Sequence, residues 1–133
     1  MASEWPKSMT EFSIVTATFP GKDLAKKTAR FLVEKRLAAC AQIFPIESVY
    51  LWKGSICDES EVMLIAKSRT ALFREVSAAI KEHHVYEVPE IVQIPITDGL
   101  PEYLQWIGDC TGQVANEKHN SCIASDCDWN LEP

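Results

Sequence analysis

The chain has no long hydrophobic run and carries little basic charge. No apolar run among its 133 residues approaches the roughly 20 residues that span a membrane. Residues 1–8 also lack the apolar core of a signal peptide. Its 13 Lys and Arg stand against 19 Asp and Glu, a formal charge of −6. Surfaces that bind nucleic acid or anionic lipid need clustered cations. We therefore expect a cytoplasmic protein with neither nucleic-acid nor membrane partners.

Motifs of the common enzyme classes are also missing. The sequence shows no Ser-His-Asp set, Walker loop, dinucleotide-binding glycine fingerprint or metalloprotease helix. We therefore predict a protein that is not an enzyme. A general base at Glu90 or His84 stays open as an alternative. A Cys40–His84 nucleophile pair also stays open, although no spacing rule supports it.

What the sequence does contain is enough apolar material for one core. The chain is 47% hydrophobic and 24% charged, which suits a single compact domain of this length. Five cysteines in a cytosolic chain are expected to be reduced thiols rather than a disulfide framework.

Hydrophobic periodicity predicts the order strand, helix, strand, strand, helix, strand, followed by a short helix that Pro101 opens. The expected strands are 11–19, 38–52 with an interruption at Pro45, 61–68 and 91–96, and the expected helices are 22–37 and 70–81. Pro45 and Pro95 place their strands at sheet edges or bulges. Residues 53–60 are expected to connect a hairpin. The order predicts an α+β, ferredoxin-like β-α-β-β-α-β sandwich with an antiparallel sheet.

Right-handed crossovers would place both main helices on one face of this sheet. The strands at 11–19 and 61–68 have apolar residues pointing to both faces of the sheet. The face without helices would therefore expose a large apolar surface. We therefore expect self-association to cover it.

Most of the chemistry of the chain is concentrated in residues 83–90, His-His-Val-Tyr-Glu-Val-Pro-Glu. This segment joins the end of the second helix to the start of the last strand, a usual place for binding groups. Neighbouring residues on a helix do not face each other, so His83 and His84 reach one ion only if the helix ends between them. Pro89 is consistent with such an ending.

Five blocks follow each other as in a known family: 37–41, 48–54, 61–67, 84–90 and 103–107. Over about residues 12–109 the chain resembles the CutA divalent-cation-tolerance family. The resemblance implies a ferredoxin-like subunit, a homotrimer similar to the nitrogen-regulatory PII proteins, and an association with copper and other divalent ions. We place the family domain at residues 11–110, between extensions at 1–10 and 111–133.

The resemblance also implies a metal site. In the family, a cysteine at the end of the first strand and a histidine pair are proposed to bind copper; here Ala17 takes the cysteine position, and His83 and His84 match the pair. Two imidazoles with water or a carboxylate such as Glu87 or Glu90 favour Cu(II) or a similar divalent ion over Cu(I). The alternative is that His83 is a packed helix-end residue, or that either histidine complements the helix dipole.

A second function is compatible with the same residues. A PII-like regulatory or scaffold trimer would bind a small ligand or partner in an inter-subunit cleft lined by Trp52, Lys67, Tyr86 and Glu90. A salt bridge between Lys67 and Glu90 across that cleft is the simpler alternative.

The extension at 111–133 is polar and lacks periodicity. Its His119, Cys122 and Cys127 are too loosely spaced, and one ligand short, to predict a zinc site. We expect the extension to dock through its larger apolar residues, Ile123, Trp129 and Leu131.

Overall fold

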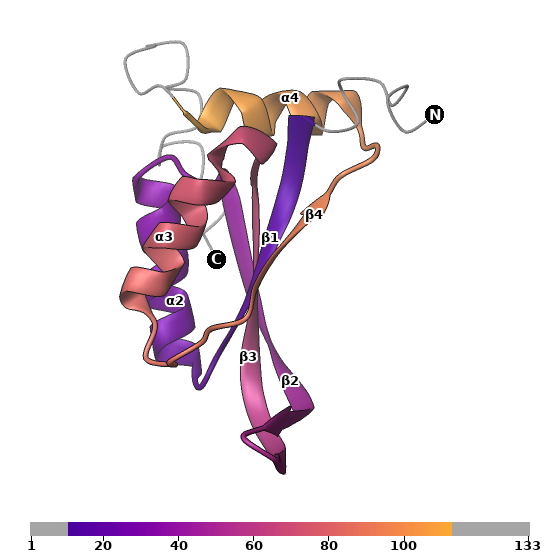
Figure 1. Cartoon of the computed structure of the whole chain (residues 1–133). Coiled ribbons are helices and arrows are strands. Elements are labelled where there is room, and N and C mark those ends of the chain that lie inside the picture. The colour runs from indigo at the N-terminus through magenta and orange to yellow at the C-terminus, as the bar shows by residue number, and fades with distance from the viewer. Residues whose placement is uncertain (1–10, 113–133) are drawn as a thin grey trace, which may run out of the picture.

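The computed structural model describes residues 11–112, which form an α+β unit around one antiparallel sheet of strand order β2-β3-β1-β4 (Figure 1). The elements are β1 (Phe12–Phe19), α2 (Lys22–Glu34), β2 (Cys40–Trp52), β3 (Ser55–Arg69), the 3-10 turn η2 (Thr70–Leu72), α3 (Phe73–His83), β4 (Ile91–Pro95) and α4 (Pro101–Cys110). The ferredoxin-like prediction is confirmed. The extension at 1–10, the residues His119, Cys122 and Cys127, and the anchor residues expected beyond 112 lie outside the described residues.

The predicted hairpin connection at residues 53–60 is wrong. Strand β3 begins at Ser55, so only Lys53 and Gly54 form the turn, with φ of 49° and 84°. A turn of two successive residues in the left-handed backbone conformation matches the right-handed twist of the flanking strands. The segment after Gly54 is polar and lacks the alternation of a half-buried strand, which is why its extended structure did not show in the pattern.

The predicted interruption at Pro45 is also wrong. Strand β2 runs without a break from Cys40 to Trp52, and Pro45 pairs with Val62. The strand lies at the edge of the sheet, where a missing N–H on the open side costs no ladder hydrogen bond. The edge positions predicted from Pro45 and Pro95 are therefore correct, because β2 and β4 are the two outer strands.

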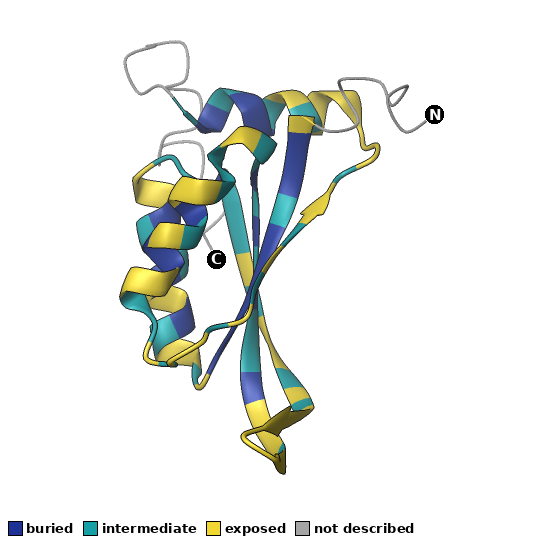
Figure 2. Cartoon of the chain, in the orientation of Figure 1, coloured by how far each residue is buried: buried dark blue, intermediate teal, exposed yellow. Residues whose placement is uncertain are grey.

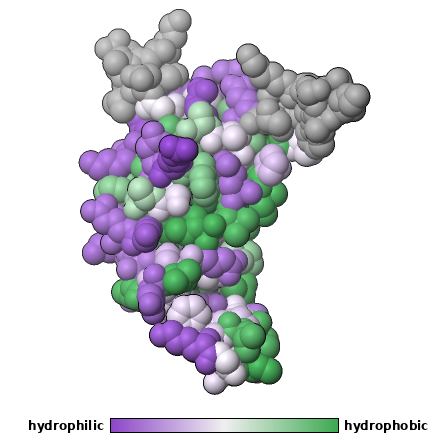
Figure 3. All heavy atoms as spheres, in the orientation of Figure 1, coloured by the Kyte–Doolittle hydropathy of each residue, from purple (hydrophilic) through white to green (hydrophobic). Residues whose placement is uncertain are grey.

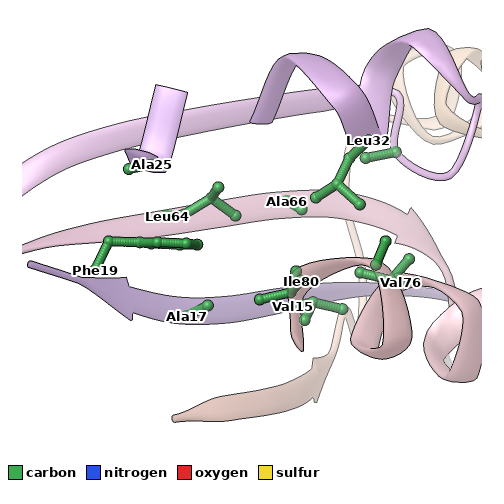
Figure 4. Close-up of a cluster of buried hydrophobic side chains, with 11 residues drawn as sticks. Val15, Ala17, Phe19, Ala25, Leu32, Leu64, Ala66, Val76 and Ile80 are labelled. Carbon is green, nitrogen blue, oxygen red and sulfur yellow. The ribbon is translucent and has the colours of Figure 1, made fainter. Parts of the chain in front are cut away.

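The core lies between the sheet and the helices α2 and α3, which pack on the same face (Figures 1 and 4). Strand β1 is central, and its side chains are buried along nearly its whole length. The helices contribute their apolar stripes, as the periodicity predicted. The cluster comprises Val15, Ala17, Phe19, Ala25, Leu32, Ala38, Leu64, Ala66, Val76, Ala79 and Ile80.

Helix α4 crosses one end of the sheet (Figure 1). Arg69, the last residue of β3, fixes its C-terminal end, because its Nη2 donates to the Gly108 carbonyl over 2.7 Å and its Nε donates to Thr111 Oγ1 over 3.1 Å. A cation beside the last carbonyls of a helix complements its dipole. A Cβ at Gly108 would lie 3.2 Å from Arg69 Nη2, so a larger residue here would push this guanidinium aside by a few tenths of an ångström.

The β2–β3 hairpin extends beyond the rest of the sheet. Strand β1 pairs with β3 only over Val62–Arg69, whereas β2 pairs with β3 as far as Trp52 and Ser55. Residues 46–52 and 55–61 therefore pair only with each other, and we call this segment the hairpin arm. Figure 2 shows it projecting away from both helices with mostly exposed residues.

We predict that Leu64→Ala lowers the free energy of unfolding by about 2–5 kcal/mol, since the side chain is fully buried between β1 and the helices. Leu100→Ala removes the same atoms from an exposed position before α4 and is expected to cost less than about 0.5 kcal/mol. Chemical denaturation of both variants measures the difference. Equal effects would contradict this assignment of the core.

Candidate functional site

Residues 84–90 connect α3 to β4 and pass over the end of β1. Helix α3 ends at His83, and His84 is extended, with φ −85° and ψ 151°. The helix therefore ends between the two histidines, and their rings project into different surroundings.

His84 anchors this loop through both of its ring nitrogens. Nε2 donates to the Thr18 carbonyl over 2.6 Å, because a carbonyl only accepts. Nδ1 accepts from the backbone N–H groups of Val85 and Tyr86, over 3.0 and 3.1 Å. The ring also stacks on Phe19 with centroids 4.5 Å apart and an interplanar angle of 15°. His84 is thus held as the neutral Nε2–H tautomer.

His83 is only half-buried and is differently engaged. Its Nδ1 donates to the Ala79 carbonyl one turn back, over 2.9 Å, and its ring packs against Phe31. Nε2 makes no hydrogen bond to a described residue. A neutral imidazole with Nδ1–H has its lone pair on Nε2, so this atom is available to a metal ion or to water.

The histidine pair does not fit a shared metal ion in this arrangement. Both nitrogens of His84 are occupied, so only His83 offers a lone pair. Ala17, at the family's cysteine position, is fully buried in the core and supplies no donor atom. Over residues 11–112, no three His, Cys, Asp or Glu side chains group together as a metal site would require.

A cavity of about 420 Å³ lies beside this loop, between the hairpin arm and residues 85–90. We call it the arm cavity. It brings together Trp52, Tyr86 and Glu90, which are three of the four predicted cleft residues, and Glu90 is exposed there. The remaining lining residues are Thr18, Tyr50, Glu61, Val85, Glu87 and Val88.

Lys67 is not part of this cavity in a single chain. It lies six residues further along β3 than Glu61, roughly 20 Å away at about 3.3 Å per residue. Its Nζ donates to Gln42 Oε1 over 2.8 Å and lies 5.7 Å from the centre of the Tyr103 ring. Among the described residues it forms no salt bridge with Glu90. A cleft lined by all four residues therefore stays a prediction, and it would need Lys67 from a second copy of the chain.

Two tyrosines of the cavity donate to glutamates of β3. Tyr86 donates to Glu61 Oε2 and Tyr50 donates to Glu59 Oε1, both over 2.6 Å. Burial and the hydrogen bond to Glu61 raise the pKa of Tyr86, while the hydrogen bond to Glu59 is the main cause that raises the pKa of Tyr50. Both phenols therefore stay protonated well above neutral pH.

Sequence reasoning did not single out Tyr50, Glu61 or Glu87 as cavity residues. The missing information was the register of the arm, which pairs Tyr50 with Cys57 and Ile46 with Glu61 and so places Tyr50 and Glu61 on one face. The aromatic residues at 50 and 52 are two positions apart, and so are the carboxylates at 59 and 61. This spacing of two is the sequence signal that would have placed each pair on one face of its strand.

The expectation of reduced thiols is wrong for Cys110. Cys40 and Cys57 are free, whereas Cys110 is disulfide-bonded. No helix in the described part of the chain is long and apolar enough to cross a membrane.

Fold and site together define a class: a ferredoxin-like α+β subunit with a projecting hairpin arm and a cavity at its base. Residues 13–110 match the family described as CutA1 divalent ion tolerance protein. The chain therefore belongs to the CutA1 divalent ion tolerance family.

Individual relatives agree with this assignment. The chain is 41% identical over 100 residues to the divalent-cation tolerance protein CutA of Thermus thermophilus, covering 74% of this chain and 97% of that protein. It is 40% identical over 105 residues to protein CutA of Mus musculus, covering 78% of this chain but only 59% of the mouse protein. The Archaeoglobus fulgidus CutA structure superposes with a TM-score of 0.73 at 40% identity, covering 74% and 97% of the two chains.

We predict that Glu61→Ala shifts the titration of one tyrosine toward its ordinary value near pH 10, because the hydrogen bond that holds its proton is lost. Alkaline difference absorbance of the phenolate measures this, with Glu75→Ala on α3 as the control. A raised folded-state pKa means that the Tyr86 contribution to stability is complete below about pH 10 and is lost as pH rises further. Identical titrations of wild type and Glu61→Ala would contradict the assignment.

Proposed function

We propose that this chain forms a homotrimer that acts in divalent-cation tolerance without catalysing a reaction, and that it binds Cu(II) or a similar divalent ion. The relatives at about 40% identity carry the description divalent-cation tolerance in their names, which supports this role. The structural observation that carries the proposal is the hairpin arm, because a two-stranded segment without a third strand is marginally stable alone.

One face of the arm is apolar and exposed. Val49, Leu51 and Ile56 share this face, since Leu51 pairs with Ile56, and they are 70%, 70% and 78% exposed. In Figure 3, hydrophobic atoms gather at the tip of the molecule that the arm forms. An exposed apolar surface of this kind is typical of a protein contact. Packing against other copies of the chain would bury it, and the family resemblance implies three copies.

The open face of the sheet supports the same conclusion. Both core helices lie on the opposite face, and Phe44, Val92 and Ile94 are exposed on the open one at 43–45%. Phe44 alternates with Val49 and Leu51 along β2, so the open face is opposite to theirs and is a second apolar surface that self-association would cover, as the two-sided apolar strands predicted.

For the metal, His83 is the ligand that we propose first. Its Nε2 makes no hydrogen bond within residues 11–112, and neutral imidazole is a favoured ligand of Cu(II). His84 would join it only after the N–H groups of Val85 and Tyr86 and the Thr18 carbonyl give up their hydrogen bonds. Glu87 and Glu90, both exposed on the same loop, are the carboxylates available to complete the ligand set.

A second candidate function rests on the arm cavity. A PII-like trimer that binds a small ligand or partner in a cleft needs a concave site with apolar walls and a few polar groups. The arm cavity has this composition, and Trp52, Tyr86 and Glu90 line it. Lys67 would join them only from a neighbouring copy.

For the compartment, we keep the cytoplasm as our proposal. The free thiols of Cys40 and Cys57 suit a reducing environment, whereas the disulfide of Cys110 does not. Relatives named periplasmic and chloroplastic show that the family occurs in several places.

We predict that the purified chain is a trimer at micromolar concentration, and that Ile56→Asp shifts it toward monomer, because burying a carboxylate in an apolar contact is costly. Light scattering coupled to size-exclusion chromatography measures the mass. Ala78→Asp adds the same charge to an exposed position on α3 and should leave the trimer intact. A monomeric wild type would overturn the proposal.

We also predict that Cu(II) binds the metal-free protein at about pH 7.5 and much more weakly at about pH 5.5, since an imidazole must be deprotonated to bind. Calorimetry gives the affinity, and electron paramagnetic resonance shows nitrogen coupling. His83→Ala should weaken binding at least about tenfold, the scale of losing a ligand.

His84→Ala is the matched variant for the copper titration. It should chiefly lower the melting temperature, because it removes three hydrogen bonds that hold the loop. Copper binding that survives the double variant His83→Ala/His84→Ala would exclude this histidine site.

A further inference from the structure

The outward face of helix α2 holds much of the positive charge of this acidic chain. Residues 22–36, the helix and the residues that end it, contain six of the 13 Lys and Arg and only two acidic residues. The cations within the helix are all exposed: Lys22, Lys26, Lys27 and Arg30. Both core helices cover the face of the sheet opposite to the open face, so this charge lies away from the surfaces that self-association would cover.

The helix does not compensate these charges itself. Lys22, Lys26 and Arg30 are spaced four residues apart, and like charges at this spacing destabilise a helix. Lys22 also lies in the first turn, where the helix dipole disfavours a cation. Arg30 pairs with Glu34 over 3.2 Å, whereas Lys22, Lys26 and Lys27 form no ion pair with a described residue. A negatively charged partner on this face would therefore stabilise it.

The described part of the chain ends beside this helix. The N–H of Gly112 donates to the Arg36 carbonyl over 3.0 Å, and Arg36 Nη2 donates to the Asp109 carbonyl over 2.8 Å. Arg36 follows the end of α2 with a φ of 59°, a backbone conformation that favours glycine. Its Nε is buried without an acceptor among the described residues. The extension that follows Gly112 therefore starts at the C-terminal end of α2, next to a donor that lacks a partner.

The composition of this extension complements the face of α2. Residues 113–133 contain four acidic residues and one lysine, and three of the acids fall within residues 126–132. The same short segment contains Trp129 and Leu131. On α2, Val33 is 41% exposed and lies seven residues, two helical turns, from Lys26, so the basic face also offers an apolar contact.

The extension is long enough to reach every cation of the helix. A 13-residue helix spans about 20 Å at about 1.5 Å per residue. The chain from residue 113 to residue 133 can extend over roughly 70 Å at about 3.3 Å per residue. Residues 126–132 can therefore lie anywhere along α2.

We propose that residues 113–133 dock on the exposed face of α2 in the same chain. Their acidic side chains pair with the lysines of that face: Asp126, Asp128 and Glu132 with Lys22, Lys26 and Lys27. An extension docked there leaves the open face of the sheet and the arm cavity uncovered. The inference therefore holds for a trimer and does not depend on a metal or a ligand.

The test is carbodiimide cross-linking of the full chain, followed by mass spectrometry of its peptides. The reagent joins a carboxylate to an amine in direct contact and adds no atoms of its own. We expect amide links from residues 126–132 to Lys22, Lys26 or Lys27. Links to Lys53 or Lys67 instead would place the extension over the arm or the open face and overturn the proposal. Links to Lys118 alone, or none, would overturn it as well.

Isotope mixing identifies the chain that provides each partner. Assemblies formed from equal amounts of unlabelled and nitrogen-15-labelled chains should give linked peptides in which both halves carry the same label. Linked peptides with one labelled half would place the extension on a neighbouring copy, which contradicts docking within a chain.

Charge reversal tests the pairing. Asp126→Lys/Asp128→Lys should lower the yield of links from Glu132 to α2 at least about fivefold, because two attractions become repulsions. Glu75→Lys/Glu82→Lys makes the same change in charge at exposed positions of α3 and should leave that yield unchanged. Combining Asp126→Lys/Asp128→Lys with Lys26→Glu/Lys27→Glu should restore links between the two segments. Yields that the reversal does not lower, or that the combination does not restore, would contradict the charge pairing.

The mass of the assembly separates this inference from the proposed trimer. Asp126→Lys/Asp128→Lys should keep the wild-type mass in light scattering, because α2 lies on the other side of the sheet from the open face. Dissociation of this variant would place the extension in a subunit interface and overturn the docking site. A monomeric wild type that still shows the links to α2 would refute the trimer and support the docked extension.

Discussion

The structure depends on a difference in length between two paired strands. Strand β1 ends at Phe19 because Pro20 and Gly21 follow, but its partner β3 continues seven residues beyond Val62. Along the shared length, the pairing buries the core between sheet and helices. Beyond it, β2 and β3 have only each other, so the same register that completes the core also produces the hairpin arm.

The loop of residues 84–90 closes the base of this arm. His84 connects the loop to the last turn of β1 through the Thr18 carbonyl, and Tyr86 connects it to β3 through Glu61. Each bond joins segments far apart in the sequence, and together they place five loop residues beside Tyr50 and Trp52 in the lining of the cavity. A side chain that the family resemblance assigns to metal binding therefore serves here first as a structural anchor. Among the described residues the two histidines differ in their contacts: His84 uses both ring nitrogens, and His83 uses only Nδ1.

The two faces of the arm offer different chemistry. One face carries exposed aliphatic side chains and is suited to contact with further copies of the chain. The other carries aromatic rings and carboxylates and borders the cavity. Because neighbouring residues of a strand point to opposite faces, both properties occur within seven residues of β2 without interfering. The aliphatic face of the arm is therefore separate from the cavity, which lies on the same face as Phe44 of the open sheet.

The sequence by itself determined the order and type of the elements, the edge strands, the end of the second helix near His83, and the family, because these follow from local periodicity, proline chemistry and ordered blocks. It did not determine the two-residue turn at Lys53 and Gly54, since polar residues after the turn hide the strand. Only the tertiary structure decided that His84 is hydrogen-bonded on both nitrogens, that Glu61 faces a cavity, and that Lys67 lies far from it. Those facts depend on register and on contacts between distant segments, which local pattern does not encode.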